Sequence, residues 1–335
     1  MFVDESRIVT LGALNDNEIE FGEDFHIYAI LSRPRSVFKS VKLNEKKIES
    51  DIIFGDTIFH YEINLETEYN STDFKISFNE AKDIFYLDFF DTNDIFDRVL
   101  QSCNIDETRL DDLKEAIEGY RLEFHAENIL KLGHYKCGRD YDFEVLYIGQ
   151  SQGRDGKRSV QERLKNHETL QSILIDYHTK HINRQIFIGM FSFKPNMVTV
   201  FNGWENEFSA TDEEQGEHSN KVLAEFIELA IGQGDVVKRE RQMINITEAA
   251  LIHHFKPSFN EKFVNNFPSE EHSSYDRYYN LEYNMLAITL NLEQPFALYN
   301  GDKRVAYYDI VNPISYNLYK DGRRDILSLF EKHKE

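Results

Sequence analysis

Residues 144–167 read EVLYIGQSQGRDGKRSVQERLKNH, and the predicted fold rests mainly on this stretch. An apolar, strand-like run ends in Tyr147-Ile148-Gly149, a polar loop containing glycines follows, and a helix comes next. Ser159-Val160-Gln161-Glu162 has the form of a capping box, which marks the start of that helix. A strand, a loop and a helix in this order suit either a phosphate-binding loop or part of a site that cuts phosphodiester bonds.

The loop does not match a nucleotide-binding P-loop, which requires G-x-x-x-x-G-K-[ST]. Gly156-Lys157 supplies the central pair, but Ser151 stands where the first glycine is needed. Arg158 stands where the pattern needs a hydroxyl. Both departures remove required groups, so we set the P-loop interpretation aside.

The helix after the loop carries two polar side chains on its apolar face. Arg163 and His167 are four residues apart and share this face with Val160 and Leu164. A buried guanidinium is costly unless an anion pairs with it, so Arg163 needs an anion nearby. A substrate phosphate would meet that need, and so would a carboxylate of the core, with His167 as an ordinary core histidine.

A second helix shows the same anomaly with the opposite charge. The stretch INITEAALIHHFKPSFN, residues 244–260, predicts a helix that Pro257 stops, and Glu248 lies at the centre of its apolar face. A carboxylate in that position either pairs with a cation or binds a metal. A purely structural ion pair between Arg163 and Glu248 therefore stays open beside the metal-site interpretation.

Together these segments resemble the GIY-YIG nucleases. That family has G-I-Y on one strand, Y-I-G on the next, a helix with Arg and often His four residues later, and a late helix with Glu. An Asn follows that Glu after about a dozen residues. The chain has Tyr147-Ile148-Gly149, then Arg163 and His167, then Glu248 followed by Asn260. Its E-x-x-L-I-x-x-x-x-P-x-x-N segment also resembles the bacterial excision-repair nuclease subunit of the same family.

The first motif is the least regular part of the resemblance, which covers about residues 130–265. Its best match is Gly133-His134-Tyr135, with His where Ile is usual. The loop QSQGRDGK is longer than in compact members, and an acidic insertion at about residues 201–217 precedes the Glu248 helix. This insertion is either a solvated loop or a lid over the site.

The resemblance implies hydrolysis with one divalent cation, Mg²⁺ or Mn²⁺. Glu248 would be the metal ligand, and Arg163 would contact the scissile phosphate. A single carboxylate suits Mg²⁺, which keeps most of its waters. His167 would orient a group or transfer a proton, and Asn260 would hold the geometry.

The resemblance also implies that Tyr135 and Tyr147 lie beside the attacking water, one of them as general base. Because the reference pKa of tyrosine is near 10, the metal or the arginine would have to acidify the phenol. We further expect Gly149, Lys157 and Arg158 to contact substrate, the two cations as contacts to backbone phosphates.

The whole chain is expected to be α+β, with four parts. Residues 1–103 hold β-rich runs about ten residues apart, which predict an acidic immunoglobulin-like sandwich. Residues 104–129 are helical in pattern and are expected to form a connecting helix. Residues 130–265 would be a GIY-YIG-like small mixed sheet flanked by helices, and residues 266–335 a β-rich extension ending in a helix.

The charge distribution limits the partners. The formal net charge is −21, and residues 1–129 hold 13 Lys/Arg against 29 Asp/Glu, whereas residues 130–265 hold 17 against 19. Few cations are available to displace counterions, so we expect recruitment to DNA rather than strong nonspecific binding. RNA stays open as a substrate, residues 1–103 are a candidate surface for a protein partner, and a double-strand break would need two sites and hence a homo-oligomer.

Other sequence features predict a cytoplasmic protein without a membrane partner. Only two cysteines occur, no apolar segment approaches 18 residues, and the N-terminus lacks the pattern of a signal peptide. The leading expectation is a DNA endonuclease in genome defence or restriction. Two alternatives stay open: an inactive GIY-YIG-fold module for nucleic-acid binding or assembly, and a protein-interaction factor that uses the acidic N-terminal domain.

Overall fold

The computed structural model divides the chain into two compact units. One unit combines Met1–Arg33 with Asp142–Glu335, and the other is Pro34–Tyr141. The structure describes residues 2–12, 25–44, 47–64, 74–89, 96–97, 121–133, 137–151, 160–165, 167–194, 220, 224, 236–280, 283, 285–292, 296–306 and 313–318. The smaller unit is therefore an insertion within the larger one.

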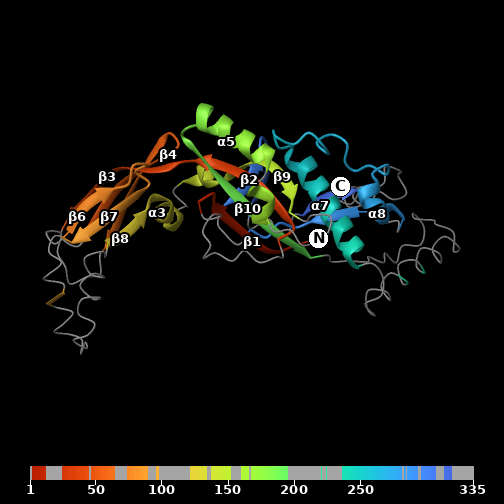
Figure 1. Ribbon diagram of the computed structural model, residues 1–335, viewed down its shortest axis with the longest axis horizontal. Helices are drawn as coiled ribbons and strands as arrows, with labels where there is room; N and C mark the ends of the chain where they lie inside the picture. The colour runs from red at the N-terminus through yellow and green to blue at the C-terminus, as the bar shows by residue number, and fades with distance from the viewer. Residues whose placement is uncertain are drawn as a thin grey trace, which may run out of the picture. The chain divides into compact units, whose positions relative to one another are not determined.

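The larger unit is built on a mixed six-stranded sheet with the order β1-β10-β2-β9-β12-β13 (Figure 1). Its strands are β1 (Phe2–Thr10), β10 (Arg184–Lys194), β2 (Ile27–Pro34), β9 (Phe143–Gln150), β12 (Ala297–Asn300) and β13 (Lys303–Ala306). Pairing is antiparallel for β1 with β10, β2 with β9 and β12 with β13, and parallel for β12 with β9. Nearly every residue of β2 is buried, as expected for a strand covered on both faces.

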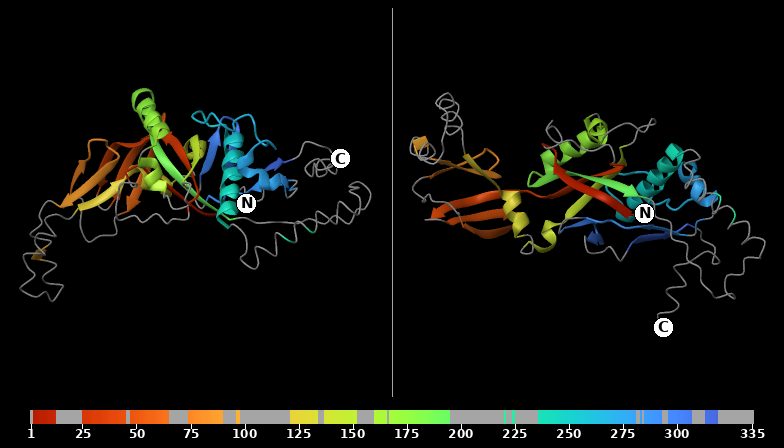
Figure 2. Two further views of the ribbon diagram at one scale, coloured as in Figure 1. Left: turned by 45° about the vertical axis from the view of Figure 1, so that its right-hand side comes forward. Right: turned by 90° about the horizontal axis from the view of Figure 1, so that it is seen from below.

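The two faces of this sheet are covered by different helices, which are α4 (Val160–Lys165) and α5 (Glu168–Lys180) on one side and α7 (Val236–Phe255) on the other. Tyr28 and Ile30 of β2 pack in one apolar cluster with side chains of α4 and α5. Ile27 and Ala29, which alternate with them, line a small apolar cavity together with side chains of α7. The helices α5 and α7 can be followed in Figures 1 and 2.

The chain after α7 packs against that helix. It contains η6 (Ser273–Tyr275), α8 (Asp276–Asn280) and an antiparallel pair of strands, β11 (Met285–Ile288) and β14 (Ile314–Asn317). Gln242 of α7 donates a hydrogen bond to Asp276 at 2.8 Å, and Asn245 donates one to the Ser274 carbonyl at 2.9 Å. These contacts fix one face of α7 and leave the face that carries Glu248 for the sheet.

The inserted unit contains two three-stranded antiparallel sheets of consecutive strands. The first is β3 (Ser36–Asn44), β4 (Lys47–Phe54) and β5 (Thr57–Asn64), and the second is β6 (Phe74–Phe78), β7 (Ile84–Phe89) and β8 (Arg121–His125). Helix α3 (Ala126–Leu132) and the short η5 (Gly138–Tyr141) complete its described part. Phe38 and Phe85 join the two sheets with their rings 5.0 Å apart, and Phe124 stacks on Phe85 at 4.6 Å.

The α+β class agrees with the sequence prediction, but the domain boundaries do not. β1 and β2, expected in a sandwich of residues 1–103, belong to the six-stranded sheet instead. The described strands of the insertion also follow one another in order, unlike the interleaved strands of an immunoglobulin sandwich. Sequence spacing identified strands correctly, but spacing carries no information about which sheet a strand joins.

The helix expected over residues 104–129 is wrong at its end, where residues 121–125 form β8 and α3 begins only at Ala126. Residues 104–120 and the expected C-terminal helix lie outside the described residues. The expected C-terminal strands do form, and two of them, β12 and β13, extend the six-stranded sheet. In the described part of the chain, no helix has both the length and the apolarity needed to cross a bilayer.

Candidate functional site

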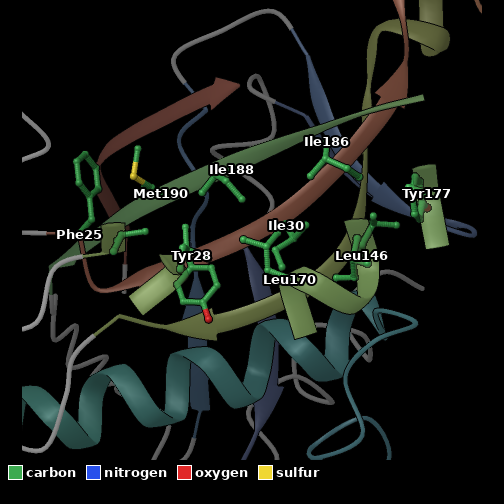
Figure 3. Close-up of a cluster of buried hydrophobic side chains, with 12 residues drawn as sticks. Phe25, Tyr28, Ile30, Leu146, Leu170, Tyr177, Ile186, Ile188 and Met190 are labelled. Atoms are coloured by element: carbon green, nitrogen blue, oxygen red, sulfur yellow. The ribbon is translucent and has the colours of Figure 1, made fainter. Parts of the chain in front are cut away.

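The pairing of β2 with β9 brings Tyr28 and Tyr147 together from either side of the insertion. Tyr28 lies opposite Gly149, and Ile30 lies opposite Tyr147. The two tyrosine rings are 6.1 Å apart between centroids and tilted by 34°. Tyr28 is fully buried in the apolar cluster, and Figure 3 shows its hydroxyl pointing away from the surrounding aliphatic side chains. The polar ends of two core tyrosines thus meet at one end of the β2–β9 pair.

Gly149 is required by this close approach. A Cβ at position 149 would lie 2.8 Å from the hydroxyl oxygen of Tyr28 and 2.8 Å from Cε1 of Tyr147. Both distances are shorter than van der Waals contact permits, so any larger residue would displace the tyrosines. The structure thus gives Gly149 a steric task, room for the two phenols, and the expected contact with substrate stays a prediction.

His167 connects this tyrosine pair to the helices. The expected single helix is in fact two, α4 and α5, and His167 is the N-cap between them. Its Nδ1 accepts a hydrogen bond from the Leu170 backbone N–H at 3.0 Å, and its Nε2 lies 2.8 Å from the hydroxyl oxygen of Tyr28. The histidine is buried, and burial together with the charge of Arg163 lowers its pKa.

These contacts determine the direction of the hydrogen bond to Tyr28. A lowered pKa keeps the imidazole of His167 neutral near pH 7, so only one ring nitrogen carries a proton. Because Nδ1 accepts from the Leu170 N–H, the proton is on Nε2, which donates to the oxygen of Tyr28. The backbone at the start of α5 therefore sets the histidine tautomer, and the histidine leaves the Tyr28 hydroxyl hydrogen free to donate elsewhere.

Arg163 lies at the open side of the group. We expected it on the buried face of its helix, but it is exposed, whereas its neighbour Leu164 is buried. Burial raises the pKa of both Tyr28 and Tyr147, and the charge of Arg163 opposes that rise in each case. The same charge acts on the pKa of His167 and Glu248. One exposed guanidinium is therefore within electrostatic reach of four site residues.

Glu248 of α7 reaches the same site from the other face of the sheet. Its side-chain Oε2 accepts a hydrogen bond from Nε2 of Gln150 at 3.2 Å. Burial raises its pKa from an ordinary value of 4.5 to about 7, although hydrogen bonding by Gln150 and the charges of Arg163 and Lys262 oppose the rise.

The purely structural ion pair is not formed. In the described part of the chain, the ion pairs within 4.0 Å do not join Arg163 to Glu248. The raised pKa of Glu248 shows in addition that nearby cations do not outweigh the effect of burial. A carboxylate held in this way would gain from a bound cation.

Asn260 fixes the strand on which the tyrosine and glycine lie. Its Oδ1 accepts from the Ile148 N–H and its Nδ2 donates to the Ile148 carbonyl, both at 2.9 Å. The neighbouring Phe259 N–H donates to the Leu146 carbonyl at 3.1 Å. The loop after α7 thus pairs with β9 as a short strand would, and it holds Ile148 between the two site residues Tyr147 and Gly149.

The donor set fits a cation that is held by few protein groups. Among the described residues, no cluster of three or more His, Cys, Asp or Glu side chains could enclose a metal ion. Mg²⁺ commonly uses one or two carboxylates, keeps several waters and shares substrate phosphates. Glu248, which accepts a hydrogen bond from the neutral side chain of Gln150 and whose pKa is raised mainly by burial, fits that mode of binding.

The structure brings five of the predicted site residues close to one another and leaves three outside its described part. Tyr147, Arg163, His167, Glu248 and Asn260 come together, whereas Tyr135, Lys157 and Arg158 lie outside the described residues. The tyrosine that faces Tyr147 is Tyr28, which the prediction did not consider. The signal for it was present in the run FHIYAIL, residues 25–31, where Ile27-Tyr28 lies in a strand.

Comparisons of the chain with protein-family models, curated proteins and solved structures yield no match. The chemistry of the site is consequently inferred from its own geometry: a buried and a half-buried phenol, a neutral histidine, an exposed arginine and a carboxylate suited to a cation.

Proposed function

We propose that the chain is a metal-dependent endonuclease that hydrolyses phosphodiester bonds in DNA, with a GIY-YIG-like catalytic unit. The observation that carries the proposal is the hydrogen bond between Tyr28 and His167, formed beside Tyr147. It supports the proposal because it joins Tyr28, which we assign to the first motif, to the histidine four residues after Arg163, and β2 with Tyr28 pairs with the Y-I-G strand. Six residues from β2, β9, the helices and the loop after α7 then meet in the combination that such a nuclease requires.

The first motif in this proposal is His26-Ile27-Tyr28, with His in place of Gly. It replaces Gly133-His134-Tyr135, because β2 pairs directly with the Y-I-G strand whereas Gly133 follows α3 in the inserted unit. The two motifs of the proposed nuclease are therefore separated by the whole of Pro34–Tyr141.

The hydrogen-bond order assigns different tasks to the two tyrosines. His167 donates to Tyr28, and burial raises the pKa of Tyr147, whereas a hydrogen bond from Tyr28 opposes that rise. Tyr147 is less buried than Tyr28 and ends this chain of donors. We therefore assign Tyr147, in its ionised form, as the base that accepts a proton from the attacking water.

The remaining residues hold the phosphate and the charge. Arg163 is exposed and cationic, so it can bind the scissile phosphate and stabilise the charge that grows on it. Glu248 would hold Mg²⁺ or Mn²⁺, which when bound would neutralise the carboxylate and polarise a phosphate oxygen. Burial raises the pKa of Tyr147, and the charge of Glu248 raises it further, so neutralising that carboxylate favours the ionised phenol.

The biological setting is part of the same proposal. A site with one metal-binding carboxylate cuts one strand, so a double-strand break would require two copies of the chain. The insertion Pro34–Tyr141 holds 14 Lys/Arg against 23 Asp/Glu, which suits a basic protein partner better than DNA. We propose a cytoplasmic enzyme of genome defence or restriction that is recruited through this acidic unit.

The test is cleavage of supercoiled plasmid and of single-stranded DNA and RNA with Mg²⁺ or Mn²⁺. Wild type should cut, Glu248→Ala should not, and Glu270→Ala, an exposed acid after α7, should cut as wild type does. Tyr28→Phe should lose activity, whereas Tyr135→Phe should keep it. If neither wild type nor Glu248→Ala cuts and the variant also melts far below wild type, the carboxylate is structural and the proposal fails.

A further inference from the structure

The carboxylate of Glu248 accepts a hydrogen bond from a neutral side chain, although a cationic side chain would stabilise its charge more directly. The amide Nε2 of Gln150 donates to Oε2 of Glu248 at 3.2 Å, and this contact joins β9 to α7. This contact places the residue that follows Tyr147-Ile148-Gly149 against the carboxylate that the proposed function assigns to the metal.

Gln150 is itself held firmly on both sides. Its backbone pairs with Ile27 in the β2–β9 ladder. The next residue, Ser151, donates its backbone N–H to the His26 carbonyl at 2.9 Å and its hydroxyl to the Phe25 carbonyl. Because the backbone is anchored before and after Gln150, the side chain starts from a fixed point, and its amide can orient the carboxylate that it contacts.

We propose that Gln150 is a positioning residue for the metal ligand Glu248. Its N–H occupies one carboxylate oxygen, and it leaves the other oxygen to face a divalent cation. This inference rests on the proposed function, since it assumes that Glu248 binds the metal. It adds a residue that acts through Glu248 and that is distinct from the tyrosines, the arginine and the histidine.

The neutrality of the amide is the physical reason for glutamine at this position. A lysine would form an ion pair with Glu248 and would compete with the metal for the same charge. A leucine would leave the carboxylate oxygen without its donor and free the side chain to rotate. A glutamine donates a hydrogen bond and adds no charge, so it orients the ligand without weakening its attraction for a cation.

The test measures Mn²⁺ binding by electron paramagnetic resonance on the full-length protein without DNA. Replacing a residue that orients a metal ligand commonly lowers metal affinity about 10-fold or more. We expect that loss for Gln150→Leu and a larger one for Gln150→Lys. The matched control Gln171→Leu, at an exposed position of α5, should bind as wild type does.

A double-mutant cycle separates positioning from a general structural effect. In a Glu248→Gln background, Gln150→Leu should cause no further loss of Mn²⁺ affinity, because the residue through which it acts is already changed. Wild-type affinity in Gln150→Leu, or an equal loss in both backgrounds, overturns the positioning role alone. A wild-type protein that binds Mn²⁺ no better than Glu248→Gln overturns both this inference and the proposed metal site.

Discussion

Replacing Asn260 with alanine should loosen the strand that carries Tyr147 and Gly149. The asparagine makes two hydrogen bonds of 2.9 Å to the backbone of Ile148, one to its N–H and one to its carbonyl. Ile148 is 3% exposed, so water cannot easily take over either bond in the variant. The substitution removes both partners of a buried peptide segment in one step.

The size of the effect follows from these two bonds. A buried polar group that loses its partner costs about 1–3 kcal/mol, so the loss of two such partners in Asn260→Ala should lower the free energy of unfolding by about 2–6 kcal/mol. For a unit of this size, 1 kcal/mol lowers the melting temperature by about 2–4 °C. Asn260→Asp should be no better, because its carboxylate still accepts from the N–H but repels the Ile148 carbonyl.

Thermal and urea unfolding would measure the loss, and plasmid cleavage would measure its consequence. Asn183→Ala, which changes an exposed turn residue, is the matched control and should melt within about 1 °C of wild type. Asn260→Ala should also lose cleavage activity below its melting range, because Ile148 lies between two site residues. An Asn260→Ala protein that melts and cuts as the control does would refute the argument that this contact holds the strand.

Three further predictions concern space, charge and modularity. Gly149→Ala places a Cβ 2.8 Å from the Tyr28 hydroxyl oxygen and should lower the rate of DNA cleavage about 100-fold, whereas the control Gly12→Ala should leave that rate unchanged. Equal cleavage rates in the two variants would show that the phenols do not need the space that Gly149 leaves. Because folding raises the pKa of Glu248 from 4.5 to about 7, its ionisation lowers stability as pH rises between these values. At pH 8, the free energy of unfolding of metal-free Glu248→Gln should therefore exceed that of wild type by up to about 3 kcal/mol, and at pH 4 the two proteins should be equally stable. A melting temperature of the variant below that of wild type at pH 8 would contradict this sign. Replacing Pro34–Tyr141 with an Asn-Gly turn should leave a folded unit that still cuts DNA, since β2 and β9 pair as an antiparallel hairpin would; circular dichroism showing an unfolded chain would contradict the division into units.

Several parts of the site followed from local sequence signals. The helix that carries Glu248 was predicted from its apolar periodicity and from Pro257, and α7 indeed ends at Phe255. The strand ending in Tyr147-Ile148-Gly149 was predicted from its apolar run and the turn residues after it, and it is β9. Periodicity, proline and glycine act within a few residues, so a sequence displays them directly.

Other parts depended on contacts between distant segments. The sequence read Arg163 and His167 as neighbours on one helix, but His167 caps a new helix because its Nδ1 bonds to the Leu170 N–H and its Nε2 meets Tyr28. Helical periodicity could not predict the contact with Tyr28, which lies in strand β2, far away in the sequence. Tertiary structure thus moved Arg163 to the surface and left His167 buried.

By itself, the sequence determined that the chain has an acidic α+β character, a Y-I-G strand and a carboxylate on the apolar face of a helix ended by proline. The three-dimensional structure was needed to show that Tyr28 is the partner of Tyr147, that Pro34–Tyr141 is an insertion and that Gln150 contacts Glu248. Helices and turns depend on neighbours a few residues away. The pairing of β2 with β9 depends instead on burying both faces of the sheet. The two strands are separated in sequence by a complete inserted unit, so no local signal encodes their pairing.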